Sequence, residues 1–243
     1  MLSSVPATIY DEGASNADEK LRRDRPMIKR IIVAQVETAI RARLEGEGAG
    51  SDWWHIDRVR NTALALAREE GADPFITELA ALVHDIADPR FHGGDDALGP
   101  AAARALLALC GTSTEVIDHI VDIVATIAFK GAGVATPMNT VEGRCAQDAD
   151  RLDALGAIGI ARCFAYGAHV KRPLYVPGEA PQLHQTPEAY RRAQSSSLLH
   201  FHEKLYLLPE RMNTATARRL AIERVAVMRA FEEQFLAEWA GTR

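Results

Sequence analysis

Cysteine is scarce in this chain: Cys110, Cys145 and Cys163 are the only three among 243 residues, and no CxxC pair occurs. An odd, scattered set disfavours a disulfide framework or a cysteine zinc site and fits a reducing compartment. Apolar runs are also short, because none reaches the roughly 18–20 residues of a membrane span. The first 26 residues carry acids and lack a hydrophobic segment. We therefore expect no secretory signal, no membrane association and a cytoplasmic location.

The chain also lacks an excess of positive charge. Its 28 Lys and Arg residues are outnumbered by 33 Asp and Glu residues, which gives a net charge of −5. This balance disfavours nucleic-acid binding as the main function, although it allows a local basic pocket. Apolar residues make up 47% and charged residues 25%, values that are ordinary for a globular protein and exclude a mainly disordered chain.

Helical periodicity dominates what is present. Residues 27–46 place isoleucine and valine side chains on one stripe at helical spacing, and few runs alternate with a period of two. Residues 1–26 are polar and without periodicity, so we expect a disordered arm there and one domain over 27–240. The sequence predicts an all-α bundle of seven or eight helices, at about 27–46, 53–70, 74–87, 97–110, 114–128, 141–166, 187–207 and 214–240.

Histidine and aspartate recur on three separate predicted helices. His55 begins one helix, the adjacent His84 and Asp85 lie near the end of the next, and Asp150 lies on a later one. Two imidazoles and two carboxylates suit a divalent first-row metal or Mg²⁺, and an octahedral ion would keep open positions for water and substrate. His84 and Asp85 interrupt an apolar run, and a carboxylate buried there must be paired or ligated. A buried ion pair, or a helix end that faces water, is the alternative interpretation of this pair.

The order His, His-Asp, Asp resembles the HD-domain superfamily of metal-dependent phosphohydrolases. The flanking segments DWWHIDRVR, LAALVHDIAD and QDADRLDALGAIGIARCFAYG are similar to the stand-alone bacterial HD hydrolases, the YedJ and YpgQ group. The resemblance covers about residues 27–240 and implies a single helical HD domain. It further implies that His55, His84, Asp85 and Asp150 bind one divalent ion, with Mn or Mg favoured over Fe, Co, Ni or Zn.

Asp88 is a candidate for proton handling. It lies three residues after Asp85, and this spacing is similar to that of a catalytic glutamate in HD-type nucleotidases. Aspartate is one methylene shorter than glutamate, which shortens its reach. The alternative interpretation is that Asp88 simply ends its helix before Pro89.

Two basic residues are further candidates for a catalytic role. Lys130 precedes a glycine-rich segment, where the backbone can approach a phosphate closely, which favours a phosphate contact; a solvated loop lysine is the alternative interpretation. Arg58 lies one turn after His55 and could reach the substrate or pair with Asp57 or Asp85. Asp153 follows the last predicted ligand by one turn and is better explained as a supporting acid than as a ligand.

The resemblance implies hydrolysis of a nucleotide, with a (deoxy)nucleoside triphosphate cleaved to monophosphate and pyrophosphate by metal-activated water. The residues alone support only cleavage of a phosphoester or phosphoanhydride. A nucleoside monophosphate phosphatase and a cyclic-nucleotide phosphodiesterase are the enzymatic alternatives. A non-catalytic module that binds metal or nucleotide is the alternative from another class, and a homodimer is plausible in each case.

Overall fold

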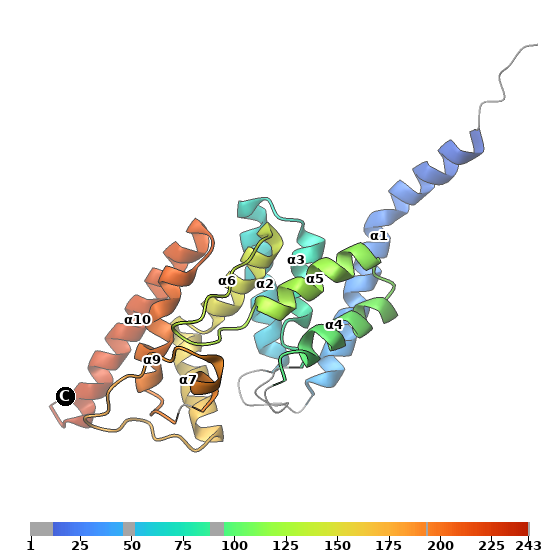
Figure 1. Cartoon of the computed structure of the whole chain (residues 1–243). Coiled ribbons are helices and arrows are strands. Elements are labelled where there is room, and N and C mark those ends of the chain that lie inside the picture. Colours follow the sequence, from blue (N-terminus) through green and yellow to red (C-terminus); the bar gives the residue numbers. More distant parts are fainter. Residues whose placement is uncertain (1–11, 46–51, 88–94, 193, 243) are drawn as a thin grey trace, which may run out of the picture.

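The structure is a computed structural model that describes residues 12–45, 52–87, 95–192 and 194–242 (Figure 1). Within these ranges the regular elements are all helices and no strand occurs, which confirms the predicted all-α class. None of the described helices is both long and apolar enough to cross a bilayer. The helices are α1 (Glu12–Arg43), α2 (Trp53–Glu70), α3 (Pro74–Val83), α4 (Leu98–Leu109), α5 (Thr114–Thr126), α6 (Val141–Asp153), α7 (Gly156–His169), α8 (Pro187–Arg191), α9 (Leu199–Glu203), the 3-10 helix η2 (Leu205–Arg211) and α10 (Ala215–Trp239).

Helices α2 and α6 pack along each other at the centre of the molecule, with α3 beside both (Figure 1). Their faces contribute to two apolar clusters. One cluster lies among α1 to α6 and includes the fully buried Val36, Leu79 and Ile120. The other lies among α2, α6, α9, η2 and α10 and includes Phe201 and Met228. The central helices therefore have buried side chains on both sides, and this fixes how α2, α3 and α6 face each other.

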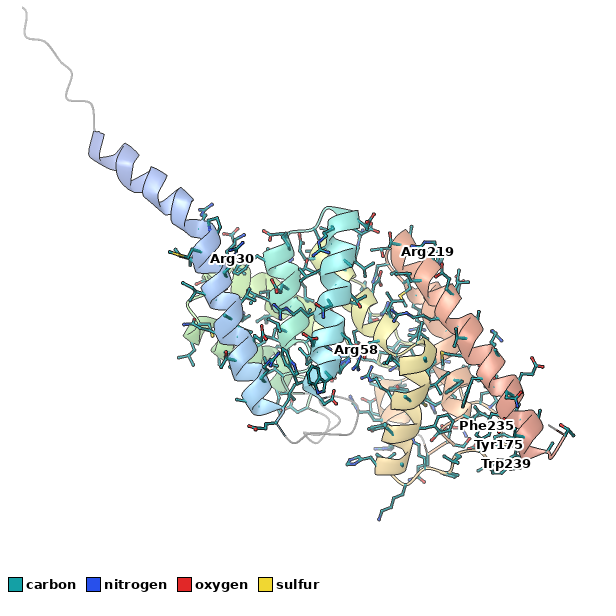
Figure 2. All side chains as sticks on the ribbon, turned by 180° about the vertical axis from the view of Figure 1, so that it is seen from behind. Arg30, Arg58, Tyr175, Arg219, Phe235 and Trp239 are labelled. Atoms are coloured by element: carbon teal, nitrogen blue, oxygen red, sulfur yellow. The ribbon has the colours of Figure 1, made fainter. Side chains whose placement is uncertain are left out.

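The second cluster continues into a stack of aromatic rings at the carboxyl end of α10. Tyr175, Phe235 and Trp239 gather there (Figure 2). The ring of Trp239 lies 5.3 Å from that of Tyr175 and 5.9 Å from that of Phe235, measured between centroids. The irregular segment between α7 and α8 is thereby attached to the last helix.

Three predicted helices end earlier than expected or divide. The helix expected over 74–87 ends at Val83, and the next four residues form turns. The helix expected over 141–166 is divided into α6 and α7, because the helical backbone is interrupted at Gly156, whose φ of 71° is accessible to glycine without strain. The helix expected over 187–207 is divided into α8, α9 and the start of η2.

The third division has a polar cause. Ser195 donates a hydrogen bond to the buried carboxylate of Glu203, and the backbone N–H of Ser196 donates to Glu179. Serine side chains and backbone groups that bond locally to acids compete with helical hydrogen bonds. The QSSS segment between α8 and α9 therefore lies outside a helix.

The amino-terminal part of the chain differs from the expected disordered arm. Helix α1 begins at Glu12, and its first turns extend away from the bundle (Figure 1). Residues 12–25 are rich in Ala, Glu, Lys, Arg and Leu, which favour a helix even without an apolar stripe. Pro26 lies within the helix. Residues 1–11 of the predicted arm lie outside the described residues, and the domain boundary at 27 stays a prediction.

Candidate metal centre and adjoining pocket

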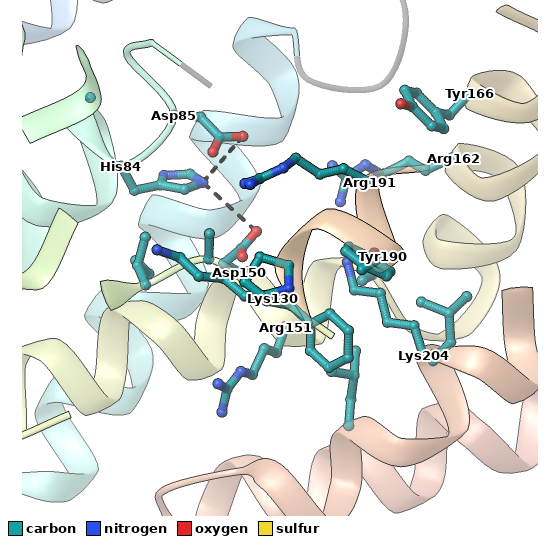
Figure 3. A pocket seen from close by; sticks show the side chains of 18 of the residues that line it. His84, Asp85, Lys130, Asp150, Arg151, Arg162, Tyr166, Tyr190, Arg191 and Lys204 are labelled. Atoms are coloured by element: carbon teal, nitrogen blue, oxygen red, sulfur yellow. Dashed lines mark ion pairs between the residues drawn. The ribbon is translucent and has the colours of Figure 1, made fainter. Parts of the chain in front are cut away.

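The predicted ligands converge where α2, the end of α3 and α6 meet. One ligand atom from each of His55, His84 and Asp150 lies within 4.8 Å of the other two. The two histidine Nε2 atoms are 3.2 Å apart, and Oδ1 of Asp150 is 3.6 and 3.7 Å from them. Oδ2 of Asp85 lies 3.5 Å from Nε2 of His55 and 3.7 Å from Nε2 of His84 (Figure 3). The structure thus brings together all four residues that the sequence analysis selected.

Local structure places each of these side chains. Asp52 caps the amino end of α2 by accepting a hydrogen bond from the backbone N–H of His55, which sets that histidine in the first turn. His84 is the C-cap residue that follows the last residue of α3, so Asp85 lies on the turn beyond it and points to the same group. Asp150 lies on the buried central helix α6.

Both imidazoles are held through their Nδ1 atoms. Nδ1 of His84 is 2.8 Å from the carbonyl oxygen of Ala81, and Nδ1 of His55 is 2.8 Å from Oδ2 of Asp153. A carbonyl oxygen only accepts, so His84 donates from Nδ1 and its Nε2 carries a lone pair; the Asp153 carboxylate directs His55 in the same way. Each Nε2 lone pair then faces the other histidine and the carboxylates, which is the arrangement that metal-ligating histidines adopt.

The spacing of these atoms suits a single ion. Bonds of about 2.1 Å in tetrahedral or octahedral geometry put neighbouring ligand atoms roughly 3.0–3.4 Å apart. The observed separations of 3.2 to 3.7 Å are close to that range. Burial lowers the pKa of His55, but hydrogen bonds with Asp153 and Asp85 outweigh burial, and the pKa lies above its ordinary value. The surroundings therefore favour a positive charge here, which a divalent ion would provide.

Asp153 connects the metal centre to two arginines. Its carboxylate accepts hydrogen bonds from Arg58 at 2.8 and 3.1 Å and from Arg162 at 2.8 Å, besides facing His55. Burial would raise its pKa, but the hydrogen bonds from His55 and Arg58 hold that pKa below the ordinary value. Asp153 is thus an ionised supporting acid. Arg58 pairs with it rather than with Asp57 or Asp85, the partners considered from the sequence.

That pairing has a structural cause. Arg58 projects from α2 near the junction with α6 (Figure 2), and Asp153 lies on the face of α6 that packs against α2. The carboxylate of Asp153 is only 7% exposed, so it gains more from a close guanidinium than a solvated acid would. The two residues are 95 positions apart in the sequence, and so local spacing could not predict this pair.

A cavity of about 200 Å³ opens beside the metal centre. His84, Asp85 and Asp150 line one end of it, and an aromatic group lines another part (Figure 3). The aromatic and imidazole rings are those of Phe129, Tyr166, Tyr190 and His200. The basic lining residues are Lys130, Arg151, Arg162, Arg172, Arg191 and Lys204.

Sequence reasoning found only one of these six cations, Lys130. Arg191 and Lys204 lie on or beside short helices that carry no apolar stripe. The sequence therefore suggests that both side chains are solvated. A weak signal exists in the spacing of His200 and Lys204, because residues four apart on a helix share one face. Both of these side chains line the cavity.

The remaining predicted residues have different outcomes. Lys130 lies in the cavity wall, where its Nζ atom is 3.3 Å from Oδ2 of Asp96. Asp88 lies outside the described residues. The catalytic roles assigned to Asp88, Lys130 and Arg58 stay predictions.

Known proteins are similar to this chain in sequence and in fold. Residues 53–155 match the family model of the HD domain. The chain is 36% identical to YpgQ of Bacillus subtilis (strain 168) over 201 residues, which is 82% of this chain and 90% of YpgQ. A solved protein of Lactobacillus plantarum is similar with a TM-score of 0.78 and 36% identity, covering 86% of this chain and 97% of that one. An HD-superfamily hydrolase of Bacillus thuringiensis is similar with a TM-score of 0.67 and 37% identity, covering 87% and 98%.

The fold and the His, His-Asp, Asp group define an HD-type helical hydrolase. The chain belongs to the HD domain family, as a metal-dependent phosphohydrolase of that superfamily. The crystal structure of YpgQ in complex with ADP is also similar to this chain, with a TM-score of 0.66 and 32% identity over 87% of this chain and all of that one.

Proposed function

We propose that this protein hydrolyses (deoxy)nucleoside triphosphates to the monophosphate and pyrophosphate. The observation that carries the proposal is the junction of two features in one cavity. His84, Asp85 and Asp150 lie at one end, and six basic side chains line the same space. A divalent ion bound by these three residues and His55, with Mn or Mg as the favoured metal, would stand next to a site suited to a polyanion.

The charge of the cavity supports a substrate with several phosphates. Among the residues that the structure describes, six basic ones and three acidic ones, Asp85, Asp96 and Asp150, line it. Two of those acids are proposed metal ligands, so a bound divalent ion would offset them. A triphosphate supplies the negative charge that such a surface lacks, whereas a neutral or singly charged ligand would not.

The aromatic part of the cavity supports a nucleotide rather than inorganic polyphosphate. The rings of Tyr190 and His200 lie nearly parallel, at 25° and 6.4 Å between centroids, and Phe129 meets Tyr190 edge to face at 5.3 Å. Flat rings of this kind offer a base an apolar face. YpgQ, which is similar over most of this chain, has been crystallised with ADP, and this favours a nucleotide ligand here as well.

The proposed reaction assigns each part a task. When bound, a divalent ion would polarise a phosphoryl oxygen and lower the pKa of a water molecule. Lys130 and Arg191 would hold the phosphates and disperse their charge. Asp153 would keep the proton of His55 on Nδ1 and hold Arg58 and Arg162 in place. Asp88 would accept the proton of the attacking water, as the sequence predicts.

A product assay tests the proposal. The protein is incubated with Mn²⁺ and each of the four deoxynucleoside triphosphates, beside an Asp85→Ala control. Monophosphate, diphosphate, pyrophosphate and phosphate are then resolved. Monophosphate with pyrophosphate in equal amounts, absent from the control, is the expected result.

Other products would point to the alternatives. Release of inorganic phosphate from nucleoside monophosphates would indicate a phosphatase, and opening of a cyclic nucleotide would indicate a phosphodiesterase. Tight nucleotide binding without any product under Mn²⁺, Mg²⁺, Co²⁺ and Ni²⁺ would contradict hydrolysis and favour a binding module.

A further inference from the structure

Asp96 lies in the cavity wall between two basic side chains from different parts of the chain. Its Oδ2 atom is 3.3 Å from Nζ of Lys130 and 3.6 Å from Nη1 of Arg191. Lys130 follows α5, whereas Arg191 ends the short helix α8. All three residues line the cavity that also contains the candidate metal ligands. An acidic side chain of the protein itself thus lies where two cations converge.

A carboxylate and a phosphate offer oxygens to ammonium and guanidinium groups in much the same way. The charged ends of Lys130 and Arg191 extend toward His84 and Asp150 (Figure 3). A phosphoryl chain that reached the metal centre would therefore pass these two cations. The carboxylate of Asp96 lies at the position of an anionic ligand between them.

The ion pairs of Asp96 are exposed to water, so another anion can replace its carboxylate at little cost. Its side chain is 44% exposed, and those of Lys130 and Arg191 are 24% and 30% exposed. Ion pairs of this exposure contribute little to stability, because water screens them and long side chains lose entropy. The pairs of Asp153, at 2.8 Å and nearly buried, are the opposite case. Breaking the Asp96 pairs would cost the fold little.

We propose that Asp96 is an internal competitor for a phosphate subsite formed by Lys130 and Arg191. In the free protein its carboxylate pairs with both cations, while Arg191 also pairs with Glu188 of α8 at 3.3 Å, and a diphosphate group displaces the Asp96 carboxylate on binding. Displacement favours ligands with several negative charges, because a single phosphate gains fewer contacts in exchange for the two ion pairs. Asp96 thereby contributes to substrate selection. This inference rests on the proposed function, in that it takes phosphates to bind at Lys130.

The test measures binding rather than turnover. Methylenediphosphonate, a pyrophosphate analogue that is not hydrolysed, is titrated calorimetrically into the full chain at a fixed free Mg²⁺ concentration. Asp96→Asn is compared with Asp95→Asn, which removes the same charge one residue away; Asp95 accepts a hydrogen bond from the N–H of Ala97. We expect Asp96→Asn to tighten binding about three- to tenfold and Asp95→Asn to change it less than about twofold. The difference should shrink at high salt.

Two results would overturn the inference. Unchanged affinity in Asp96→Asn would mean that its carboxylate does not compete. Weaker binding would mean that Asp96 instead positions the two cations for the ligand. Lys130→Ala separates this inference from the proposed function: if it binds the phosphonate as well as the unaltered protein does, the subsite is absent. If Asp96→Asn binds the phosphonate more tightly, as expected, but no triphosphate is hydrolysed, the phosphate subsite is supported and only the proposed reaction is contradicted.

Discussion

Two neighbouring groups of side chains in the cavity differ in how they are held. The candidate metal ligands form its metal end, and Lys130 and Arg191, whose charged ends extend toward those ligands, form its cationic end (Figure 3). At the metal end, the side chains of His55 and His84 are 0% and 1% exposed, lie on or at the end of packed helices, and are each oriented by a hydrogen bond of 2.8 Å. At the cationic end, Lys130 and Arg191 come from a connection and a five-residue helix, and their ion pairs are 3.3 and 3.6 Å long.

The difference follows from what each end has to do. A metal centre loses affinity when its ligands are free to move, so rigid positions held by buried partners are an advantage. A phosphate subsite must admit and release a large charged ligand, and partly exposed cations on a connection and a short helix allow this. We therefore expect substitutions at the metal end to abolish function and those at the cationic end to reduce it by degrees.

Asp85→Ala should have the largest effect. It removes one of the proposed metal ligands from the turn after α3, so metal-dependent hydrolysis should fall to the background rate. Asp85 is partly exposed, at 20% of its side chain, and so the helical fold should survive. Initial rates with Mn²⁺ and a deoxynucleoside triphosphate give the first result, and far-ultraviolet circular dichroism gives the second. Activity equal to that of the unaltered protein would remove the metal-site assignment.

Asp153→Asn should have the second largest effect, because it weakens metal binding without removing a proposed ligand. An amide can donate to Nδ1 of His55 and so favour the tautomer whose Nε2 carries a proton. We expect metal affinity to fall about 10–100-fold, as for other residues that orient ligating histidines. Competition with a chromophoric chelator measures it.

Asp148→Asn is the matched control for this change. Asp148 is fully buried on the same helix, α6, but its carboxylate accepts hydrogen bonds from Asn213 and Thr214 rather than from a ligand. It should lower the melting temperature with little change in metal affinity. Equal losses of metal affinity in the two variants would mean that Asp153 acts only through general stability.

Lys130→Ala should have an intermediate effect at the cationic end. Loss of one charged hydrogen bond to a phosphate should raise KM about tenfold and leave metal affinity unchanged. Steady-state kinetics at saturating Mn²⁺ measure this. Arg219→Ala, which removes an exposed cation on α10, serves as the control and should change neither quantity. A metal affinity that falls with Lys130→Ala would show that the two ends are not independent.

Deletion of residues 1–25 should have the smallest effect. The described residues that line the cavity include none from α1, and its first turns extend away from the bundle (Figure 1). We expect kcat/KM to stay within about twofold, the range of changes at surfaces remote from a site. A large loss of activity, measured against the full chain under identical conditions, would assign this segment to the site.

Much of the fold could be read from local patterns. The apolar stripes predicted the helices at the positions of α2, α4 and α5 to within about two residues, since burial of one face governs a helix of that length. The predictions were wrong where local chemistry competes with periodicity. The left-handed backbone at Gly156 interrupts one predicted helix, and Ser195 and Ser196 form hydrogen bonds with acids inside another.

The candidate site was predictable to a similar degree. His55, His84, Asp85 and Asp150 were selectable because polar residues in apolar surroundings require partners, and because their order resembles a known family. Arg162 and Arg191 could not be selected, because an arginine on a helix is usually solvated and nothing local distinguishes these two; Lys204 had only the weak signal of its spacing from His200.

By itself the sequence determined the helical class, the family and the four residues of the candidate metal centre, since each depends on residue type and short-range spacing. Only the tertiary structure decided which side chains these and the neighbouring charged residues contact. His55 meets Asp153 across 98 positions, and Asp96 meets Arg191 across a comparable distance. Such pairs depend on how α2 packs against α6 and on where the short helix α8 lies. The buried faces that set this packing are shared among many residues, and none of them identifies its partner in the sequence.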